Sequence, residues 1–161
     1  MEEEQIGNTS PPDECIVRVP PWVWFLLSML AGVGLQRFVP LSFPAQLDSL
    51  IGWIVVGAGM ALLAWSERQF TLQKTSHDHR EIASTLITTG PFRFSRNPVY
   101  LGLLILLLGL AISLNTLWIL FFAPLVMLVM QFHVVPKEEV CLEKLFPDTY
   151  PRYRQSVRRW L

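Results

Sequence analysis

The sequence predicts an all-α membrane protein with about four transmembrane helices, the last two of which form a tight helical hairpin. Two features of the composition favour this fold class. Apolar residues make up 52% of the 161 residues, and the mean hydropathy is +0.39, which is high for a soluble domain of this size. A third observation is the pattern, because the apolar residues form long runs while the charged residues lie between or after them.

The first two predicted spans cover about residues 22–39 and 49–65, each close to the length that a helix needs to cross a bilayer. The second contains Gly52, Gly57 and Gly59, and small residues let membrane helices approach closely. The Gly-Ala-Gly sequence in this run lacks the strand and helix context of a dinucleotide-binding motif. We therefore interpret it as a helix-packing face.

The third apolar run, from Val99 to Phe132, is too long for one span at the rise of an α-helix. We expect a turn at residues 113–116, which divides this region into spans at about 99–113 and 116–135. The two spans then form a tight helical hairpin. The charged segment after them is expected to form an amphipathic helix on the cytoplasmic side.

Two polar segments that carry most of the Lys and Arg, 67–98 and 136–161, flank this hairpin. The positive-inside rule predicts that both face the cytoplasm. With four spans, the acidic N-terminal tail at 1–18 faces it too, and its composition predicts disorder. Residues 19–161 are expected to form one multi-pass membrane domain.

The charges exclude some classes of partner. Lys+Arg and Asp+Glu both number 13, and no basic run interleaves with aromatic residues, so we expect no nucleic-acid partner. The histidines in segment 77–79 and His133 lack the spacing of metal ligands, which predicts no metal site. Cys15 and Cys141 belong to no paired motif and are expected to be reduced thiols.

A cluster of polar and aromatic residues precedes the third predicted span. Asn97 is a good N-cap residue, and Pro98 suits the first turn of a helix. A helix N-terminus beside Arg93 and Arg96 is suited to bind a carboxylate or phosphate. Alternatively, the two arginines only follow the positive-inside rule, and Tyr100 is an ordinary interfacial aromatic residue.

A pair of carboxylates, Glu138 and Glu139, follows the fourth predicted span. Acidic residues are favoured in the first turn of a helix, which is one interpretation of the pair. The functional alternative is that one glutamate binds an ammonium group or ribose hydroxyls while the other pairs with an arginine. Because both clusters lie at the open end of one hairpin, we expect them to be close in space.

Both clusters resemble a known family. The stretch from Leu86 to Gly102, LITTGPFRFSRNPVYLG, resembles the L-V-T-x-G-P-Y-R-x-x-R-H/N-P-x-Y-x-G stretch of the isoprenylcysteine carboxyl methyltransferase and phospholipid methyltransferase superfamily. The tail from Glu138 to Leu161, EEVCLEKLFPDTYPRYRQSVRRWL, is similar to the ending of that superfamily, which runs from a Glu-Glu pair to Arg-Trp-Leu. The resemblance covers residues 84–161.

This resemblance implies methyl transfer from S-adenosylmethionine to a lipophilic acceptor, such as the carboxylate or amine of a lipid-like molecule. It implies a cofactor region at 84–100 and 136–161. The residues that it implies for the cofactor pocket are Thr85, Leu86, Ile87, Phe92, Asn97, Pro98, Val99, Tyr100 and Glu138. The chemistry of the cofactor adds Arg93 or Arg96 as the partner of its carboxylate. Glu139, the neighbour of Glu138, is also expected to bind the cofactor.

The expected catalytic residues are Arg96, Asn97, Tyr100 and Glu138, acting by positioning rather than by acid–base chemistry. Asn97 stands where eukaryotic carboxyl methyltransferases have histidine. Val134 stands where the prenylcysteine enzymes have a substrate-binding arginine, which argues against a prenylcysteine acceptor. Two other readings stay open: an NADPH-dependent membrane reductase of the sterol or steroid reductase type, and a non-enzymatic membrane scaffold.

Overall fold

The computed structural model describes residues 19–43, 49–73 and 85–161, and every element in this part of the chain is helical. The predicted N-terminal tail and the segment 77–79 lie outside the described residues. In chain order the elements are α1 (Pro21–Phe38), α2 (Ser49–Leu72), the 3-10 turn η2 (Gly90–Arg93), α3 (Pro98–Ser113), α4 (Leu117–Val129), the π-helical turn η3 (Met130–Val134), α5 (Val135–Leu145) and α6 (Tyr150–Ser156). The all-α class is confirmed for the described residues.

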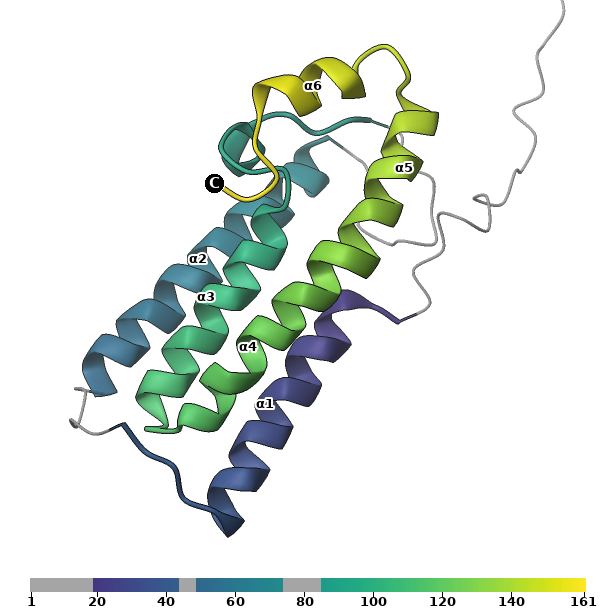
Figure 1. Cartoon of the computed structure of the whole chain (residues 1–161). Helices are drawn as coiled ribbons and strands as arrows, with labels where there is room; N and C mark the ends of the chain where they lie inside the picture. The colour runs from purple at the N-terminus through teal and green to yellow at the C-terminus, as the bar shows by residue number, and fades with distance from the viewer. Residues whose placement is uncertain (1–18, 44–48, 74–84) are drawn as a thin grey trace, which may run out of the picture.

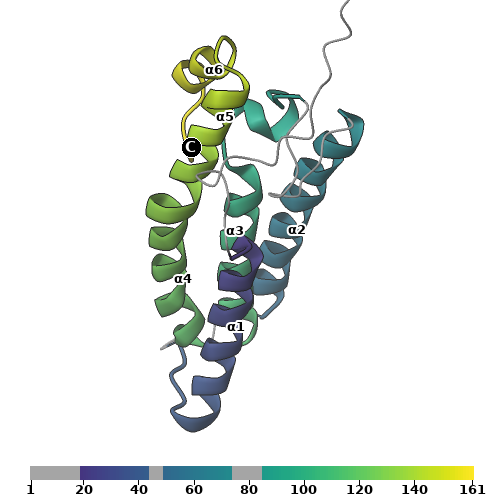
Figure 2. The same ribbon diagram turned by 90° about the vertical axis from the view of Figure 1, so that its right-hand side faces the viewer.

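The long helices lie side by side as an elongated bundle (Figures 1 and 2). α3 packs against both α2 and α4, and α1 packs mainly against α4. The core of the described residues lies between α1, α3 and α4, where Leu107, Ala111, Ile119 and Met130 are buried. The short helix α6 and the C-terminus cap one end of the bundle (Figure 1).

α2 is longer than the sequence predicted, because the helix continues to Leu72 rather than ending near residue 65. Two side chains in the additional turns are buried, Ser66 and Gln69. The Ser66 hydroxyl donates to the carbonyl of Leu62 at 2.8 Å, so it is satisfied by its own helix. These small or flexible polar side chains allow the helix to extend into the polar end of the bundle.

The fourth predicted span and the charged segment after it are joined, because α4, η3 and α5 form one continuous helical run from Leu117 to Leu145. A proline inside an α-helix lacks a donor and clashes with the carbonyl four residues earlier. The chain accommodates Pro136 with a wide π-helical turn, in which the Val135 N–H donates to the Met130 carbonyl five residues back. The helix therefore continues past Pro136 into α5.

Two helical runs of the described residues are long and apolar enough to cross a membrane, Ser49–Leu72 and Leu117–Leu145. α3 is a shorter apolar helix. Many large apolar side chains on these helices are exposed, including Trp53 and Phe121, as expected of surfaces that face lipid. The arrangement as four spans stays a prediction.

The turn between α3 and α4 lies at the predicted residues 113–116 and is held by α1 and the segment that follows it. Asn115 adopts φ 49°, a left-handed conformation that asparagine tolerates better than most residues. Its side-chain carbonyl accepts from the Phe43 N–H at 3.2 Å. The Thr116 hydroxyl donates to Gln36 Oε1 at 3.1 Å.

The contact between α2 and α3 depends on glycine. A Cβ atom on Gly59 would lie 2.8 Å from the backbone nitrogen of Leu106 and 2.9 Å from the carbonyl of Gly102. Both obstacles are backbone atoms, so neither can move away at low cost. A Cβ atom on Gly57 would have nothing within 4 Å. Of the predicted Gly-Ala-Gly packing face, only Gly59 therefore packs against α3.

We expect Gly59→Val to destabilise the protein by about 1–3 kcal/mol, because it overpacks a helix contact made of backbone. Gly57→Val is the matched control, since it has the same change in helix propensity but points into open space. The measurement is unfolding in detergent micelles, followed by circular dichroism. Equal losses in both variants would contradict this account of the α2–α3 contact.

Candidate functional site

The two predicted clusters meet at one end of the bundle. Residues 85–97, α5, α6 and the C-terminus all lie at this end (Figure 1). Residues 85–97 lie between α2 and α3, the first helix of the hairpin. α5 continues α4, the second helix of the hairpin, through η3. The expectation that the clusters are close in space is therefore confirmed.

The loop that carries the first cluster is fixed to the end of α2. The Thr89 hydroxyl donates to Gln69 Oε1 at 3.0 Å. Gly90 follows with φ +61°, and a Cβ atom there would lie 2.8 Å from the Gln69 side chain, so this position requires glycine. The ring of Phe92 packs edge-on against Phe70, with centroids 5.6 Å apart. These contacts place η2 and the residues after it.

Tyr100 and Glu138 join the two arms of the hairpin. Tyr100 lies in the first turn of α3 and is 5% exposed. Its hydroxyl donates to Glu138 Oε1, on α5. The pair brings an aromatic ring and a carboxylate together at the end of an apolar hairpin.

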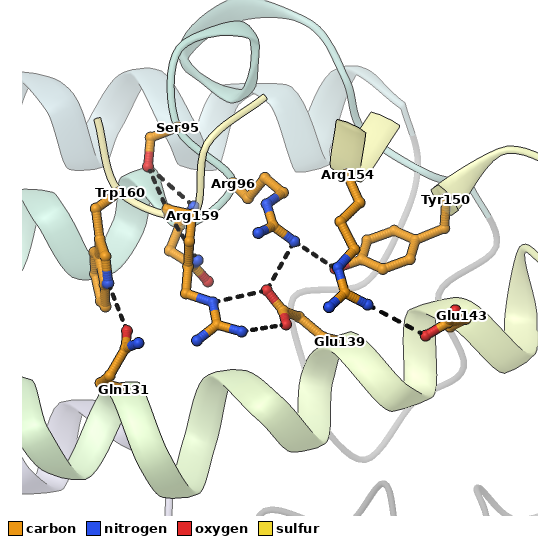
Figure 3. A network of polar contacts seen from close by, with 10 residues as sticks. Ser95, Arg96, Gln131, Glu139, Glu143, Tyr150, Arg154, Arg159 and Trp160 are labelled. Carbon is orange, nitrogen blue, oxygen red and sulfur yellow. Dashed lines mark hydrogen bonds and ion pairs between the residues drawn. The ribbon is translucent and has the colours of Figure 1, made fainter. Parts of the chain in front are cut away.

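Glu139 is buried and is bound by two arginines (Figure 3). Arg159 donates to it in a bidentate manner, with Nε 3.0 Å from Oε1 and Nη2 2.6 Å from Oε2. Arg96 Nη1 lies 2.8 Å from Oε1 and also donates to the Tyr150 hydroxyl at 3.3 Å. One of the two predicted arginines thus forms an ion pair with the second glutamate, as one sequence interpretation expected.

Asn97 occupies the N-cap position of α3, but its side chain does not cap the helix. Its Nδ2 instead donates to the carbonyl of Arg159 at 2.9 Å. Ser95 Oγ donates to the same carbonyl at 3.3 Å, and the Arg96 N–H donates to the carbonyl of Arg158 at 3.0 Å. The sequence prediction of a side-chain cap is therefore wrong: the amide is held by the bond that Nδ2 donates to the Arg159 carbonyl, and its oxygen accepts no capping bond from α3.

Two tyrosines of α6 complete this end of the molecule. Tyr153 is buried, and its hydroxyl donates to the carbonyl of Phe92 at 2.8 Å. Burial raises the pKa of Tyr153 above its usual value. Burial and the nearby Glu139 carboxylate also raise the pKa of Tyr150. Both phenols therefore stay neutral at physiological pH and keep their hydroxyl protons.

The sequence model of a family described as phospholipid methyltransferase matches residues 47–149, which is more than half of the chain. The chain belongs to the phospholipid methyltransferase family. The superfamily resemblance found in the sequence is confirmed by this match.

The chain is also similar to an uncharacterized protein of Haemophilus influenzae. It is 42% identical over 67 residues, which cover 39% of the chain and the whole of the relative. No solved structure matches the chain.

The other predicted cofactor residues differ in exposure. Thr85 and Arg93 are exposed, Leu86 and Val99 are half-buried, and Ile87, Phe92 and Pro98 are buried. Sequence reasoning gave no role to Tyr150, Tyr153 or Arg159, although it included them in the similar C-terminal pattern. The regular occurrence of Tyr, Arg and Trp in that tail was the signal that could have identified them.

Cys141 on α5 is disulfide-bonded, so the prediction of a reduced thiol at this position is wrong. Cys15 lies outside the described residues.

We expect Tyr153→Phe to destabilise the protein by about 1–3 kcal/mol, because it leaves the buried carbonyl of Phe92 without its donor. Tyr150→Phe removes a longer bond of 3.3 Å and should cost less. Chemical denaturation in detergent, monitored by tryptophan fluorescence, measures both. The reverse order of stability would show that the Tyr153 bond does not hold α6 on the loop.

Proposed function

We propose that this protein is an S-adenosylmethionine-dependent methyltransferase that acts at a membrane on the carboxylate or amine of a lipophilic acceptor. The observation that carries the proposal is the Tyr100–Glu138 pair, which lies at the end of an apolar hairpin. Membership of the phospholipid methyltransferase family supports the same reaction class. The apolar helices support a membrane location.

The residues around this pair fit the proposed cofactor. S-adenosylmethionine has a sulfonium cation, an ammonium group, a carboxylate and an adenine. Glu138 supplies a carboxylate for the ammonium group or the ribose hydroxyls, while Tyr100 and Phe92 supply aromatic faces for cationic or planar groups. Because Arg96 is bound to Glu139, we assign the cofactor carboxylate to the exposed Arg93.

Thr85, Leu86, Ile87, Asn97, Pro98 and Val99 are the remaining proposed wall of the pocket, and all lie on the loop or the first turn of α3. The bound cofactor would supply a methyl group already activated by the sulfonium. The chain then has to orient and desolvate the reactants rather than move a proton. Tyr100 contributes by orienting Glu138, because its hydroxyl donates to the carboxylate and the tyrosine itself is buried.

The acceptor is the less defined partner. A lipophilic molecule can reach this end of the hairpin along the exposed apolar faces of α2 and α4. Val134 is 3% exposed and lies within η3, so this position offers no cation to a prenylcysteine carboxylate. We therefore favour a lipid with an amine or a differently placed carboxylate.

S-adenosylhomocysteine should raise the melting temperature of the detergent-purified protein, whereas NADPH should not. Glu138→Ala should abolish the increase, because it removes the carboxylate proposed to hold the cofactor. Glu143→Ala is the matched control, since this glutamate lies on the same helix with its side chain 51% exposed. A shift with NADPH alone would favour a reductase, and no shift with either would favour a scaffold.

We also propose that the end of the bundle with the site faces the cytoplasm, on the basis of the predicted positive-inside distribution. In a variant with both cysteines replaced by serine, Arg152→Cys in α6 should react with a membrane-impermeant maleimide only after the cells are permeabilised. Leu114→Cys, in the turn at the other end of the hairpin, should react in intact cells. The reverse pattern would place the site on the opposite side of the membrane and contradict the proposal.

A further inference from the structure

The two consecutive glutamates of α5 have different partners. Glu138 accepts from Tyr100 on α3. Glu139 binds Arg96, in the loop before α3, and Arg159, near the C-terminus. Neighbouring residues on an α-helix point about 100° apart, so the direction of one side chain fixes the direction of the other. The orientation of Glu138 thus depends on how α5 is rotated about its axis.

The rotation of α5 needs an anchor because of what precedes it. α5 follows the π-helical turn η3, where the register of the helix changes by one residue relative to an α-helix. A change of register at this point turns every later side chain to a new direction. The indole Nε1 of Trp160 donates to Gln131 Oε1 in this turn at 2.7 Å, so the C-terminal segment contacts η3 as well as α5.

Arg159 is the residue that connects these parts most directly. Its side chain contributes two of the bonds to Glu139. Its carbonyl accepts from Asn97 and Ser95, in the loop that leads to Tyr100. Arg159 therefore joins α5 to the loop with its side chain on one and its backbone on the other (Figure 3).

Arg96 alone does not provide the same anchor. It contributes one contact to Glu139, through Nη1, which is shared with the Tyr150 hydroxyl. Its Nε is buried without a hydrogen-bond partner among the described residues. A single shared contact defines the orientation of a carboxylate less well than a bidentate guanidinium does.

We propose that Arg159 is a positioning residue for methyl transfer, which sets the rotation of α5 through Glu139 and thereby directs Glu138 toward Tyr100. This inference rests on the proposed function for its catalytic consequence. It assigns separate roles to the two glutamates: Glu138 contacts the cofactor, and Glu139 holds the helix. Arg159 lies beyond residues 47–149, to which the family match extends.

The chain contains a matched control for this role. Arg154 and Glu143 form an ion pair between α6 and α5, with Nη1 3.6 Å from Oε2 and side chains 48% and 51% exposed. It involves the same residue types as the Arg159–Glu139 pair. An exposed pair contributes little, because water and salt screen it. Arg154→Ala therefore removes a charge from the same region without releasing α5.

The positioning step can be measured without any ligand. The protein has three tyrosines, so 3-fluorotyrosine gives three ¹⁹F resonances that Tyr→Phe variants assign. Arg159→Ala should move the resonance of Tyr100, whose hydroxyl bonds to Glu138 and not to Arg159, while Arg154→Ala should leave it in place. An unmoved Tyr100 resonance in Arg159→Ala would overturn the proposal. Arg159→Lys, which keeps the charge but not the bidentate contact, should give a smaller shift and serves if the alanine variant does not fold.

The consequence for the site is measured by calorimetric titration with S-adenosylhomocysteine, at a temperature where each variant is folded. Arg159→Ala should raise the Kd by about ten-fold or more, Arg159→Lys by less, and Arg154→Ala not at all. A residue with only a structural role would lower the melting temperature and leave the Kd of the folded protein unchanged, which would also overturn the proposal. If the wild-type protein does not bind but the Tyr100 resonance moves in Arg159→Ala, the proposed function fails while the positioning of Glu138 by Arg159 stands.

Discussion

The buried carboxylate of Glu139 is the contact on which this end of the molecule depends. A buried charge is costly unless it is paired and hydrogen-bonded, and here two guanidinium groups supply the pairing. Removing either arginine would leave a poorly compensated charge in the interior. The loop, the second arm of the hairpin and the C-terminal residues are therefore held in one arrangement, although they lie far apart in the sequence.

The rest of the bundle makes this arrangement possible by providing a stable base. Gly59 lets α2 approach α3 at backbone distance, and α2 then extends to the polar end, where Gln69 holds the loop at Thr89. On the other side, η3 lets the helical run pass Pro136 and continue into α5. The two parts of the site, residues 85–97 and α5, thus lie at the ends of long apolar helices, and the polar groups are concentrated there.

Such a division of the molecule suits methyl transfer to a lipophilic acceptor. An activated methyl group needs a partner held in line and protected from water more than it needs a general base. In the proposed function, a site at the end of apolar helices would hold the charged cofactor at the edge of the membrane, within reach of an acceptor that stays in lipid. The family match supports this class of chemistry, and the pair of Tyr100 and Glu138 is where we propose that it takes place.

The sequence by itself determined the helical class, the turn at residues 113–116 and the meeting of the two clusters, because these follow from local composition and hydropathy. Its family was indicated by the resemblance of two stretches to a known superfamily. Only the tertiary structure decided that Glu138 faces Tyr100 while Glu139 faces two arginines. It also decided that Asn97 binds the backbone of Arg159 rather than capping its own helix. These outcomes depend on the rotation of α5 and on contacts between residues 20 to 62 positions apart in the sequence, and neither is set by a residue's neighbours in the chain.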